Sequence, residues 1–247
     1  MTRDQRLDVD FEDVYQGRSL VPGAEVPIDV APWDIAGPQP EVVALAESGA
    51  FRGAVLDAGC GLGENAIYLA SRGLRVTGAD GAETALRKAR ERAARAGVEV
   101  EFTQVDVTTF DGVEQRFDTV LDSALYHCLG DEQRLTYAGA LWRVTAPGAT
   151  LHLLCFADVG NEGFRLPLSV TQDDLRDHLG GWWEIREIEP ADYTMSMTQD
   201  AVERMGVENL RRTGVTHAPE HLRTDDRGRI VGRMWRLRAD RAPTPAH

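Results

Sequence analysis

The sequence predicts an α/β protein with a doubly wound, mostly parallel, seven-stranded sheet that carries helices on both faces. The first observation is that short apolar segments of strand length alternate with segments of helical periodicity from residue 54 onward. The second is a glycine-rich turn at residues 59–63, directly after the first apolar segment. The third is the composition, because 247 residues with 43% hydrophobic and 27% charged side chains suit one sizeable domain plus lid segments.

Each expected strand is an apolar run bounded by turn residues or by a helical segment. The first reads Ala-Val-Leu-Asp-Ala and leads directly into the glycine-rich turn. In chain order, the expected strands cover residues 54–58, 74–79, 98–104, 117–121, 150–156, 182–188 and 230–237.

Four helices are expected between these strands, at residues 64–71, 83–96, 131–144 and 171–179. The third should stop before Pro147 and Gly148, because proline cannot continue a helix. The fourth begins with Thr171, and acidic residues in its first turn favour a helix start.

Two segments lie outside this minimal sheet. Residues 1–50 contain a short amphipathic helical pattern, an extended proline-rich stretch at 26–40 and a helix at 41–47. Residues 190–227 are inserted between the last two expected strands and contain a helical pattern at 199–212. Because ligands of open α/β sheets bind beyond the carboxyl ends of the strands, both segments are candidate lids on a main domain at 51–247. Ordinary packing on the sheet edge is the alternative.

The glycine-rich turn predicts a site for a nucleotide-like cofactor. Gly59, Gly61 and Gly63 form a Gly-x-Gly-x-Gly loop that includes Cys60, and Glu64 stands where a dinucleotide fingerprint has its third glycine. NAD is therefore disfavoured. Asp57 ends the preceding strand, and its carboxylate would repel a pyrophosphate but suits the ammonium group of an amino acid. S-adenosylmethionine has such an ammonium group and no phosphate.

This pattern resembles the first motif of the class I S-adenosylmethionine-dependent methyltransferases. The resemblance implies a Rossmann-like fold, S-adenosylmethionine as the methyl donor and S-adenosylhomocysteine as the product. An acid at the end of the second strand, Asp80 followed by Gly81, can accept both ribose hydroxyls. By the resemblance, Asp106 accepts the adenine amino group beside the Val107 backbone N–H. Plain turn acids are the alternative at both positions.

The fourth motif of the same family resembles residues 117–123, with Asp122 and Ser123 under the methionine part of the cofactor or the acceptor. Tyr126 and His127 follow in the loop at the expected mouth of the site. A neutral imidazole there could act as general base for the acceptor, since its ordinary pKa of about 6.5 suits that role. The alternative is that His127 packs in the loop without touching substrate.

The other expected site residues line the cofactor or the acceptor. Trp33 could cover the cofactor or stack on an aromatic acceptor, or simply pin the N-terminal segment to the sheet. Aromatic walls are expected from Tyr15, Tyr126, Phe156 and Phe164, and the late insert could offer His217 or His221.

No metal site is expected. His217 and His221 match the His-x-x-Glu-His spacing of zinc proteases, but that motif needs an uninterrupted helix and Pro219 interrupts it. The cysteines Cys60, Cys128 and Cys155 form no Cys-x-x-Cys pair.

Charge and hydropathy restrict the partners and the compartment. A formal net charge of −13 disfavours a polyanion such as tRNA or DNA and favours a small acceptor. No apolar run has the ~20 residues needed to cross a membrane, and the first residues lack the apolar core of a signal peptide. We therefore expect a cytoplasmic protein that does not bind membranes; the sequence leaves its oligomeric state open.

A narrower resemblance rests on residues 11–15, 32–34, 38–40, 51–53 and 122–127. These segments are similar to a group of actinobacterial small-molecule methyltransferases of the benzoquinone or heterocyclic-toxin type, and more distantly to thiopurine-type S-methyltransferases. The resemblance implies secondary metabolism and methyl transfer to N, O or S of a small, flat, aromatic or heterocyclic acceptor. The alternatives are a methyltransferase for RNA or protein and a non-catalytic S-adenosylmethionine-binding protein.

Overall fold

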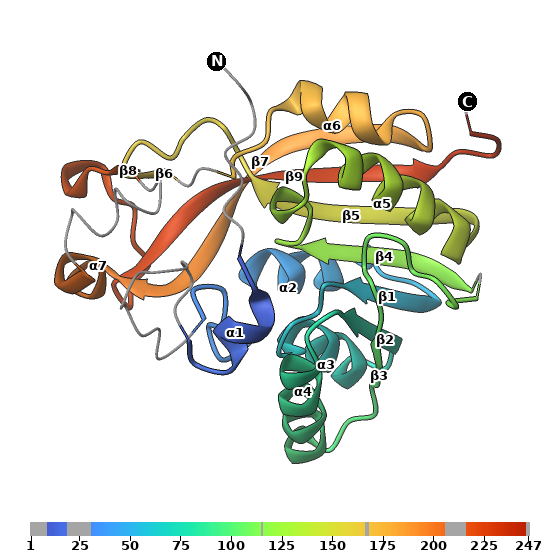
Figure 1. Ribbon diagram of the computed structural model, residues 1–247, viewed down its shortest axis with the longest axis horizontal. Coiled ribbons are helices and arrows are strands. Elements are labelled where there is room, and N and C mark those ends of the chain that lie inside the picture. The colour runs from blue at the N-terminus through green and yellow to red at the C-terminus, as the bar shows by residue number, and fades with distance from the viewer. Residues whose placement is uncertain (1–8, 19–30, 115, 166–167, 206–215, 246–247) are drawn as a thin grey trace.

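The computed structural model describes residues 9–18, 31–114, 116–165, 168–205 and 216–245. Within them, seven strands form one sheet in the order β3-β2-β1-β4-β5-β9-β7, as Figure 1 shows. In this order, the first five strands, β3, β2, β1, β4 and β5, run parallel to one another. β9 is antiparallel to both of its neighbours, β5 and β7. The predicted fold class is confirmed. The strand bounds are β1 Ala54–Ala58, β2 Arg75–Asp80, β3 Glu101–Gln104, β4 Phe117–Ser123, β5 Thr145–Phe156, β7 Trp183–Thr198 and β9 Arg229–Arg241.

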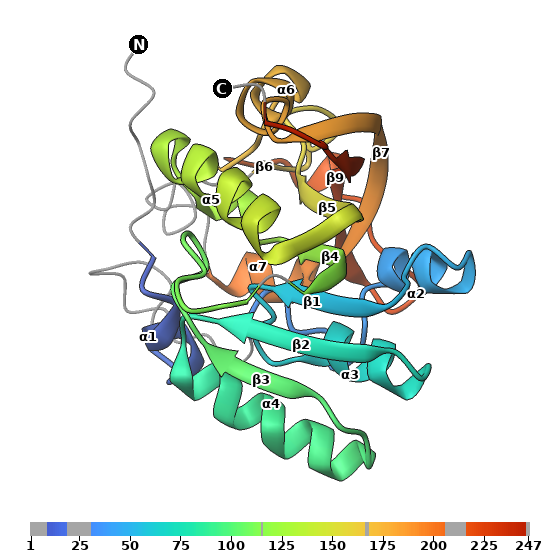
Figure 2. The same cartoon turned by 90° about the vertical axis from the view of Figure 1, so that its right-hand side faces the viewer.

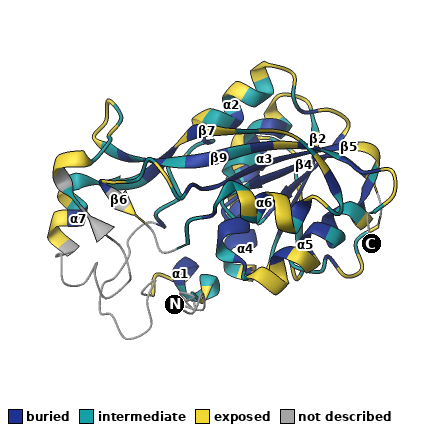
Figure 3. Ribbon diagram, turned by 90° about the horizontal axis from the view of Figure 1, so that it is seen from above, coloured by how far each residue is buried: buried dark blue, intermediate teal, exposed yellow. Residues whose placement is uncertain are grey.

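Helices cover both faces of the sheet. On one face lie α2 (Pro40–Glu47), α3 (Glu64–Ser71) and α4 (Glu83–Ala96); on the other lie α5 (Asp131–Val144) and α6 (Gln172–Leu179), as Figures 1 and 2 show. Each face has its own apolar cluster, and Figure 3 shows the buried residues gathered in the strands and the sheet-facing sides of the helices. The two-layer covering explains why the central strands read as continuous apolar runs.

The expected helices 64–71, 83–96 and 131–144 match α3, α4 and α5 residue for residue. In α4, Leu86, Ala89 and Ala93 are buried at helical spacing, and Gly97 ends the helix in the left-handed conformation. In α6, Thr171 is the N-cap, and its side chain accepts a hydrogen bond from Asp174 N.

The two largest differences from the predicted strand bounds arise because a strand is extended by its partner. β5 begins at Thr145, since Thr145 pairs with Phe117 of β4, and Gly148 at φ 77° lies inside an irregular stretch of this pairing. β7 continues to Thr198 because Thr198 pairs with Arg229 of β9. The insert after β7 therefore begins at residue 199 and not at 190.

Beyond the sheet, β7 and β9 continue as a two-stranded arm that carries α7 (Gln199–Met205) at its far end (Figure 1). The rest of the helical pattern predicted at 199–212 lies outside the described residues. The small antiparallel pair β6 (Phe164–Arg165) and β8 (Thr216–His217), followed by the 3₁₀ turn η2 (Pro219–His221), was not predicted.

The N-terminal segment is attached at both ends. In α1 (Phe11–Tyr15), Glu12 accepts hydrogen bonds from the backbone N and hydroxyl of Thr84 at the start of α4. Further along, the backbone N of Ser196 in β7 donates to Pro32 O at 2.8 Å, and Gln39 Nε2 donates to Thr194 O at 3.0 Å. The N-terminal segment thus joins α4 to the arm. No helix among the described residues is long and apolar enough to cross a membrane.

Candidate functional site

The glycine loop after β1 has the shape that its sequence predicts. The backbone N–H groups of Gly59 and Cys60 both donate to Ala79 O in β2, at 2.8 and 3.0 Å. Gly63, at φ 79°, is the N-cap of α3, so the loop leads into the positive end of that helix. A Cβ on Gly59 would lie 2.9 Å from Leu125 Cβ, so the loop is also packed against the turn after β4.

Tyr15 and Trp33 lie directly over this loop. Gly61 has φ 52°, and a Cβ there would come within 2.6 Å of the Tyr15 hydroxyl. Trp33 Nε1 donates to the same hydroxyl at 3.0 Å, and the two rings meet edge to face. The structure therefore places Tyr15 against the cofactor loop, whereas the sequence analysis assigned it to the acceptor wall. Trp33 lies over the same loop, and its role as a cover for the cofactor stays a prediction.

Asp57 has the environment expected of a ligand for a cation. It is buried at the end of β1, and its Oδ2 has no hydrogen-bond partner among the described residues. Burial, together with the nearby carboxylates of Asp122 and Asp80, raises the pKa of Asp57 to about 7. A buried carboxylate with an unpaired oxygen is stabilised by a cationic partner, and the ammonium group of S-adenosylmethionine is such a partner.

Asp80 faces the same loop from β2. Its Oδ2 accepts a hydrogen bond from Gly61 N at 2.8 Å and its Oδ1 accepts one from Ala82 N at 2.9 Å. These bonds fix the carboxylate beside the exposed Gly81 and leave each oxygen a further lone pair for a hydroxyl donor. Burial raises the pKa of Asp80, against the opposing effect of the backbone hydrogen bonds.

The adenine-side residues follow β3 in a turn. Asp106 is exposed, and its Oδ1 accepts hydrogen bonds from Thr108 N at 2.8 Å and from Thr108 Oγ1 at 2.6 Å. The turn-forming alternative for Asp106 is thus present in the structure. Val107 is half-buried and packs at the edge of the core cluster that contains Phe110.

Asp122 holds the turn after β4. Its Oδ1 accepts from the backbone N of Leu125 and Tyr126, at 2.9 and 3.2 Å, and its Oδ2 accepts from the Tyr137 hydroxyl at 2.8 Å. These bonds support Ala124, whose φ of 81° is rare for a residue with a Cβ. Burial nevertheless raises the pKa of Asp122 to about 7. The bonds of Asp122 therefore hold the turn after β4 together.

His127 is buried in the 3₁₀ turn η1 (Tyr126–Cys128), against the end of β5. Its Nδ1 accepts a hydrogen bond from Phe156 N at 3.4 Å, and its ring packs on the Phe156 ring with 4.6 Å between centroids. Burial, helped by the charge of Arg134, lowers the pKa of His127 to about 3. Such an imidazole is neutral at pH 7 but a weak base, so the geometry favours the packing alternative.

Tyr193 completes the aromatic group on this side, and the sequence analysis did not select it. Its ring meets Phe156 edge to face at 6.1 Å, and burial raises the pKa of its hydroxyl, with nearby Ser123 offsetting part of the effect. Tyr193 lies in the arm part of β7, which was expected to be an insert. Alternation of buried Ala191, Tyr193 and Met195 is the sequence signal that could have revealed this strand.

Of the two histidines expected from the late insert, His221 has a described side chain and His217 does not. His221 is exposed in η2, and its backbone lies against Gly163. His217 pairs with Phe164 in the small sheet, and the side chains of both lie outside the described residues. Among the described residues no group of three or more His, Cys, Asp or Glu side chains could hold a metal ion.

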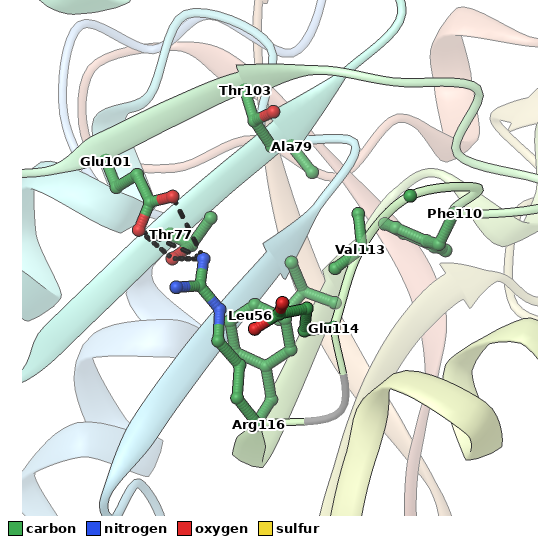
Figure 4. Close-up of a pocket in the computed structure, with 11 residues that line it drawn as sticks. Leu56, Thr77, Ala79, Glu101, Thr103, Phe110, Val113, Glu114 and Arg116 are labelled. Atoms are coloured by element: carbon green, nitrogen blue, oxygen red, sulfur yellow. Dashed lines mark hydrogen bonds and ion pairs between the residues drawn. The ribbon is translucent and has the colours of Figure 1, made fainter.

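A separate cavity of about 240 Å³ lies on the sheet face next to the β3–β4 connection (Figure 4). Arg116 closes one side by donating to Glu101 at 3.0 Å and to Thr77 Oγ1 at 3.2 Å. None of the predicted site residues lines it. The cavity is bounded by Leu56, Thr77, Ala79, Glu101, Thr103, Phe110, Gly112, Val113, Glu114, Arg116 and Phe117.

The glycine loop, the unpaired oxygen of Asp57 and the carboxylate of Asp80 fit S-adenosylmethionine, and together with the sheet order they define an S-adenosylmethionine-dependent methyltransferase. A methyltransferase-domain family model matches residues 55–148. The chain belongs to the class I S-adenosylmethionine-dependent methyltransferases. It is an enzyme of that class, and its cofactor is S-adenosylmethionine.

Three known proteins show how far the similarity extends. The chain is 38% identical over 183 residues to the 2-heptyl-1-hydroxyquinolin-4(1H)-one methyltransferase of Mycobacteroides abscessus, covering 73% of this chain and 79% of that one. A solved structure from work on the conversion of a disulfide bond into a thioacetal group during echinomycin biosynthesis is 33% identical, with TM-score 0.73 and coverage of 94% and 90%. The 1,6-didemethyltoxoflavin-N1-methyltransferase of Burkholderia thailandensis, solved with S-adenosylhomocysteine bound, is 21% identical, with TM-score 0.55 and coverage of 82% and 77%, and shares the fold.

Proposed function

We propose that this methyltransferase transfers the methyl group to N, O or S of a small, aromatic or heterocyclic acceptor. The observation that carries the proposal is that side chains of the N-terminal segment cover the glycine loop. Tyr15 and Trp33 lie on the glycine loop, and the segment that carries them is hydrogen-bonded to the β7 arm through Ser196. A site covered by side chains in this way suits a ligand that is small enough to be enclosed.

The relatives support the same size of acceptor. The Mycobacteroides abscessus protein is named for a quinolone with a hydroxyl on its ring nitrogen, which is a small heterocycle. Aromatic side chains at the end of β5 and in the arm, Phe156 and Tyr193, offer flat apolar surface for such a ring. We propose that Tyr126, His127, Phe156 and Tyr193 surround the acceptor side.

We assign the cofactor side to the glycine loop and its neighbours. Asp57 pairs with the ammonium group, Asp80 accepts the ribose hydroxyls, and Trp33 covers the cofactor together with Tyr15. When bound, the cofactor supplies an electrophilic methyl group on a good leaving group. The chain therefore has to align the acceptor, exclude water and accommodate a proton where the acceptor carries one.

We propose that the N-terminal segment up to residue 50 and the insert after β7 are lids of this site. The N-terminal lid is supported by the hydrogen bonds of Thr84 to Glu12 in α1 and of Thr194 to Gln39, which attach that segment to α4 and β7. A closing lid would exclude water from the reaction.

A methyltransferase for RNA or protein is the competing proposal. It would use the same cofactor loop but needs an open acceptor groove, with a basic surface if RNA is the target. The net charge of −13 disfavours an RNA substrate, and the cover that Tyr15 and Trp33 form over the glycine loop disfavours an open groove.

The test is methyl transfer from labelled S-adenosylmethionine to a small panel. The panel contains an N-hydroxyquinolone, a hydroquinone, a flat azaheterocycle, an aryl thiol and an aryl disulfide, with tRNA and a protein mixture as controls. Transfer to a small acceptor is expected. Transfer to tRNA or protein alone would overturn the proposal.

A further inference from the structure

Arg134 is a buried cation next to the proposed acceptor side. It lies in the first turn of α5, and only 8% of the residue is exposed. Its Nη1 is 3.6 Å from Asp131 Oδ1, a long ion pair with a side chain that is 61% exposed. Its Nε is buried without a hydrogen-bond partner among the described residues.

The position of Arg134 is unfavourable for a charge that serves stability alone. A positive charge in the first turn opposes the helix dipole. Taking a guanidinium out of water is costly unless a close counter-ion compensates, and a solvent-exposed pair at 3.6 Å compensates little. A bound anion would supply the missing partner.

Tyr126 adds a second unsatisfied group at the same place. The Arg134 guanidinium lies 5.1 Å from the centre of the Tyr126 ring, and the buried Tyr126 hydroxyl also has no hydrogen-bond partner among the described residues. Arg134 offers N–H donors only, and the tyrosine hydroxyl can donate as well. Together they suit an electron-rich oxygen.

The carboxylates around this pair have other roles. Asp122 in β4 is held by Tyr137 and two backbone amides, and Asp174 in α6 accepts hydrogen bonds from the backbone N and hydroxyl of Thr171 at 3.0 and 2.8 Å. The charge of Arg134 also reaches the acceptor side, since it helps to lower the pKa of His127 and opposes the rise that burial causes in the pKa of Cys128.

The pair adjoins the cofactor loop. Leu125, the residue before Tyr126, is the one that packs against Gly59. We propose that Arg134 and the Tyr126 hydroxyl bind a negatively charged oxygen of the acceptor, which makes an acidic hydroxyl compound, bound as its oxyanion, the substrate class of this enzyme. This inference rests on the proposed function above.

An ionised acceptor would also explain why methyl transfer needs no strong base, although His127 is a weak one. The oxyanion carries the electron pair that forms the new O–C bond. The C–S bond of the sulfonium breaks, its electron pair stays on sulfur, and the sulfonium charge is neutralised. No proton has to pass to the protein in this step, because the acceptor loses it to water before binding.

The experiment measures acceptor binding by calorimetry in the S-adenosylhomocysteine complex, where no turnover occurs. The probes are 2-heptyl-1-hydroxyquinolin-4(1H)-one and an acidic nitrophenol, each paired with an analogue in which the hydroxyl is replaced by hydrogen. Binding is measured at one pH unit below and above the hydroxyl pKa of each probe. Wild type is compared with Arg134→Gln, Arg134→Lys and Tyr126→Phe, and with Arg143→Gln, an exposed arginine of the same helix.

For wild type and Arg143→Gln we expect at least one acidic probe to bind about tenfold more tightly above its pKa than below it, a difference that its hydrogen analogue lacks. Arg134→Gln should lose this difference, Arg134→Lys should retain part of it, and Tyr126→Phe should reduce it. Retention of the full pH difference in Arg134→Gln, or binding of hydrogen analogues alone, would overturn the inference. Methylation of a neutral heterocycle would then leave the proposed function standing, whereas transfer to tRNA alone would overturn both.

Discussion

Trp33 Nε1 donates a hydrogen bond of 3.0 Å to the Tyr15 hydroxyl, which lies against Gly61 in the glycine loop. The two residues come from the N-terminal segment, 46 and 28 positions before the loop residue they cover. Because the indole occupies a lone pair of the hydroxyl oxygen, the Tyr15 O–H proton remains to be donated elsewhere. The contact attaches the N-terminal segment to the glycine loop.

Tyr15→Phe should weaken the binding of S-adenosylhomocysteine by roughly three- to tenfold, the loss of one partly compensated hydrogen bond. Tyr68→Phe, a half-buried tyrosine of α3, is the matched control and should leave binding unchanged. Isothermal titration of both variants measures the effect. Equal affinities in Tyr15→Phe and wild type would show that the hydroxyl does not serve the cofactor.

Gly61→Ala should combine backbone strain with a steric clash against Tyr15. Its φ of 52° disfavours a side chain, and the new Cβ would be 2.6 Å from the Tyr15 hydroxyl. We expect a loss in the free energy of unfolding greater than the about 1–2 kcal/mol that the backbone strain alone costs, with S-adenosylhomocysteine affinity reduced tenfold or more. Gly97→Ala has a similar φ of 68° with no atom within 4 Å, so denaturant titration should show a smaller loss and calorimetry normal binding. Normal binding by Gly61→Ala would contradict the placement of the cofactor.

Asp57→Asn should stabilise the ligand-free protein at pH 8 and weaken cofactor binding. Its pKa of about 7 lies above the ~3.9 of an unfolded aspartate. The folded state therefore holds the proton more tightly, so the contribution of Asp57 to stability is lost as pH rises from about 4 to about 7. The asparagine stays neutral, and we expect a gain of at least about 1 kcal/mol at pH 8 by denaturant unfolding, which vanishes below pH 4.

The binding half of the same prediction has its own pH dependence. Wild type should bind S-adenosylhomocysteine more weakly as pH falls from 8 to 6, because Asp57 becomes protonated and loses its attraction for the ammonium group. In Asp57→Asn this dependence should be absent. Asp111→Asn, whose side chain is 89% exposed, should behave like wild type in both measurements. A pH-independent affinity in wild type would refute the pairing.

His127→Asn should leave the shape of the pH–rate profile unchanged between pH 6 and 9. A group whose pKa is lowered to about 3 does not titrate in that range, and asparagine can still accept the hydrogen bond from Phe156 N. We expect kcat/KM within about tenfold of wild type, well short of the 10²–10⁴ typical of a lost general base. Loss of an alkaline or acid limb in the variant would restore the base role. The control for replacing a buried histidine is His152→Asn. His152 lies elsewhere on β5, and its pKa is lowered to about 4.

The sequence by itself determined the sheet, the helices that flank the glycine loop and the nature of the cofactor. These follow from local signals. Residues 64–71, 83–96 and 131–144 form helices because their apolar side chains repeat at helical spacing, and the loop glycines adopt left-handed conformations that few other residues accept. Asp57 and Asp80 were identifiable because their distance from the loop along the chain is fixed by the strand–turn–helix unit.

Only the tertiary structure decided the environment of the residues proposed for the acceptor side. Tyr193 lies there because pairing with β9 extends β7 to Thr198; the alternation of Ala191, Tyr193 and Met195 indicates a strand, but only the pairing shows where it lies. The bonds of Asp122 and the packing of His127 depend on Tyr137, Phe156 and Arg134, which lie on other elements. For His127 these contacts favour the packing alternative over the base role. The contact of Tyr15 with Gly61 likewise joins residues that are distant in the sequence. Burial, pKa and hydrogen-bond satisfaction depend on contacts between distant residues, so no local pattern can encode them.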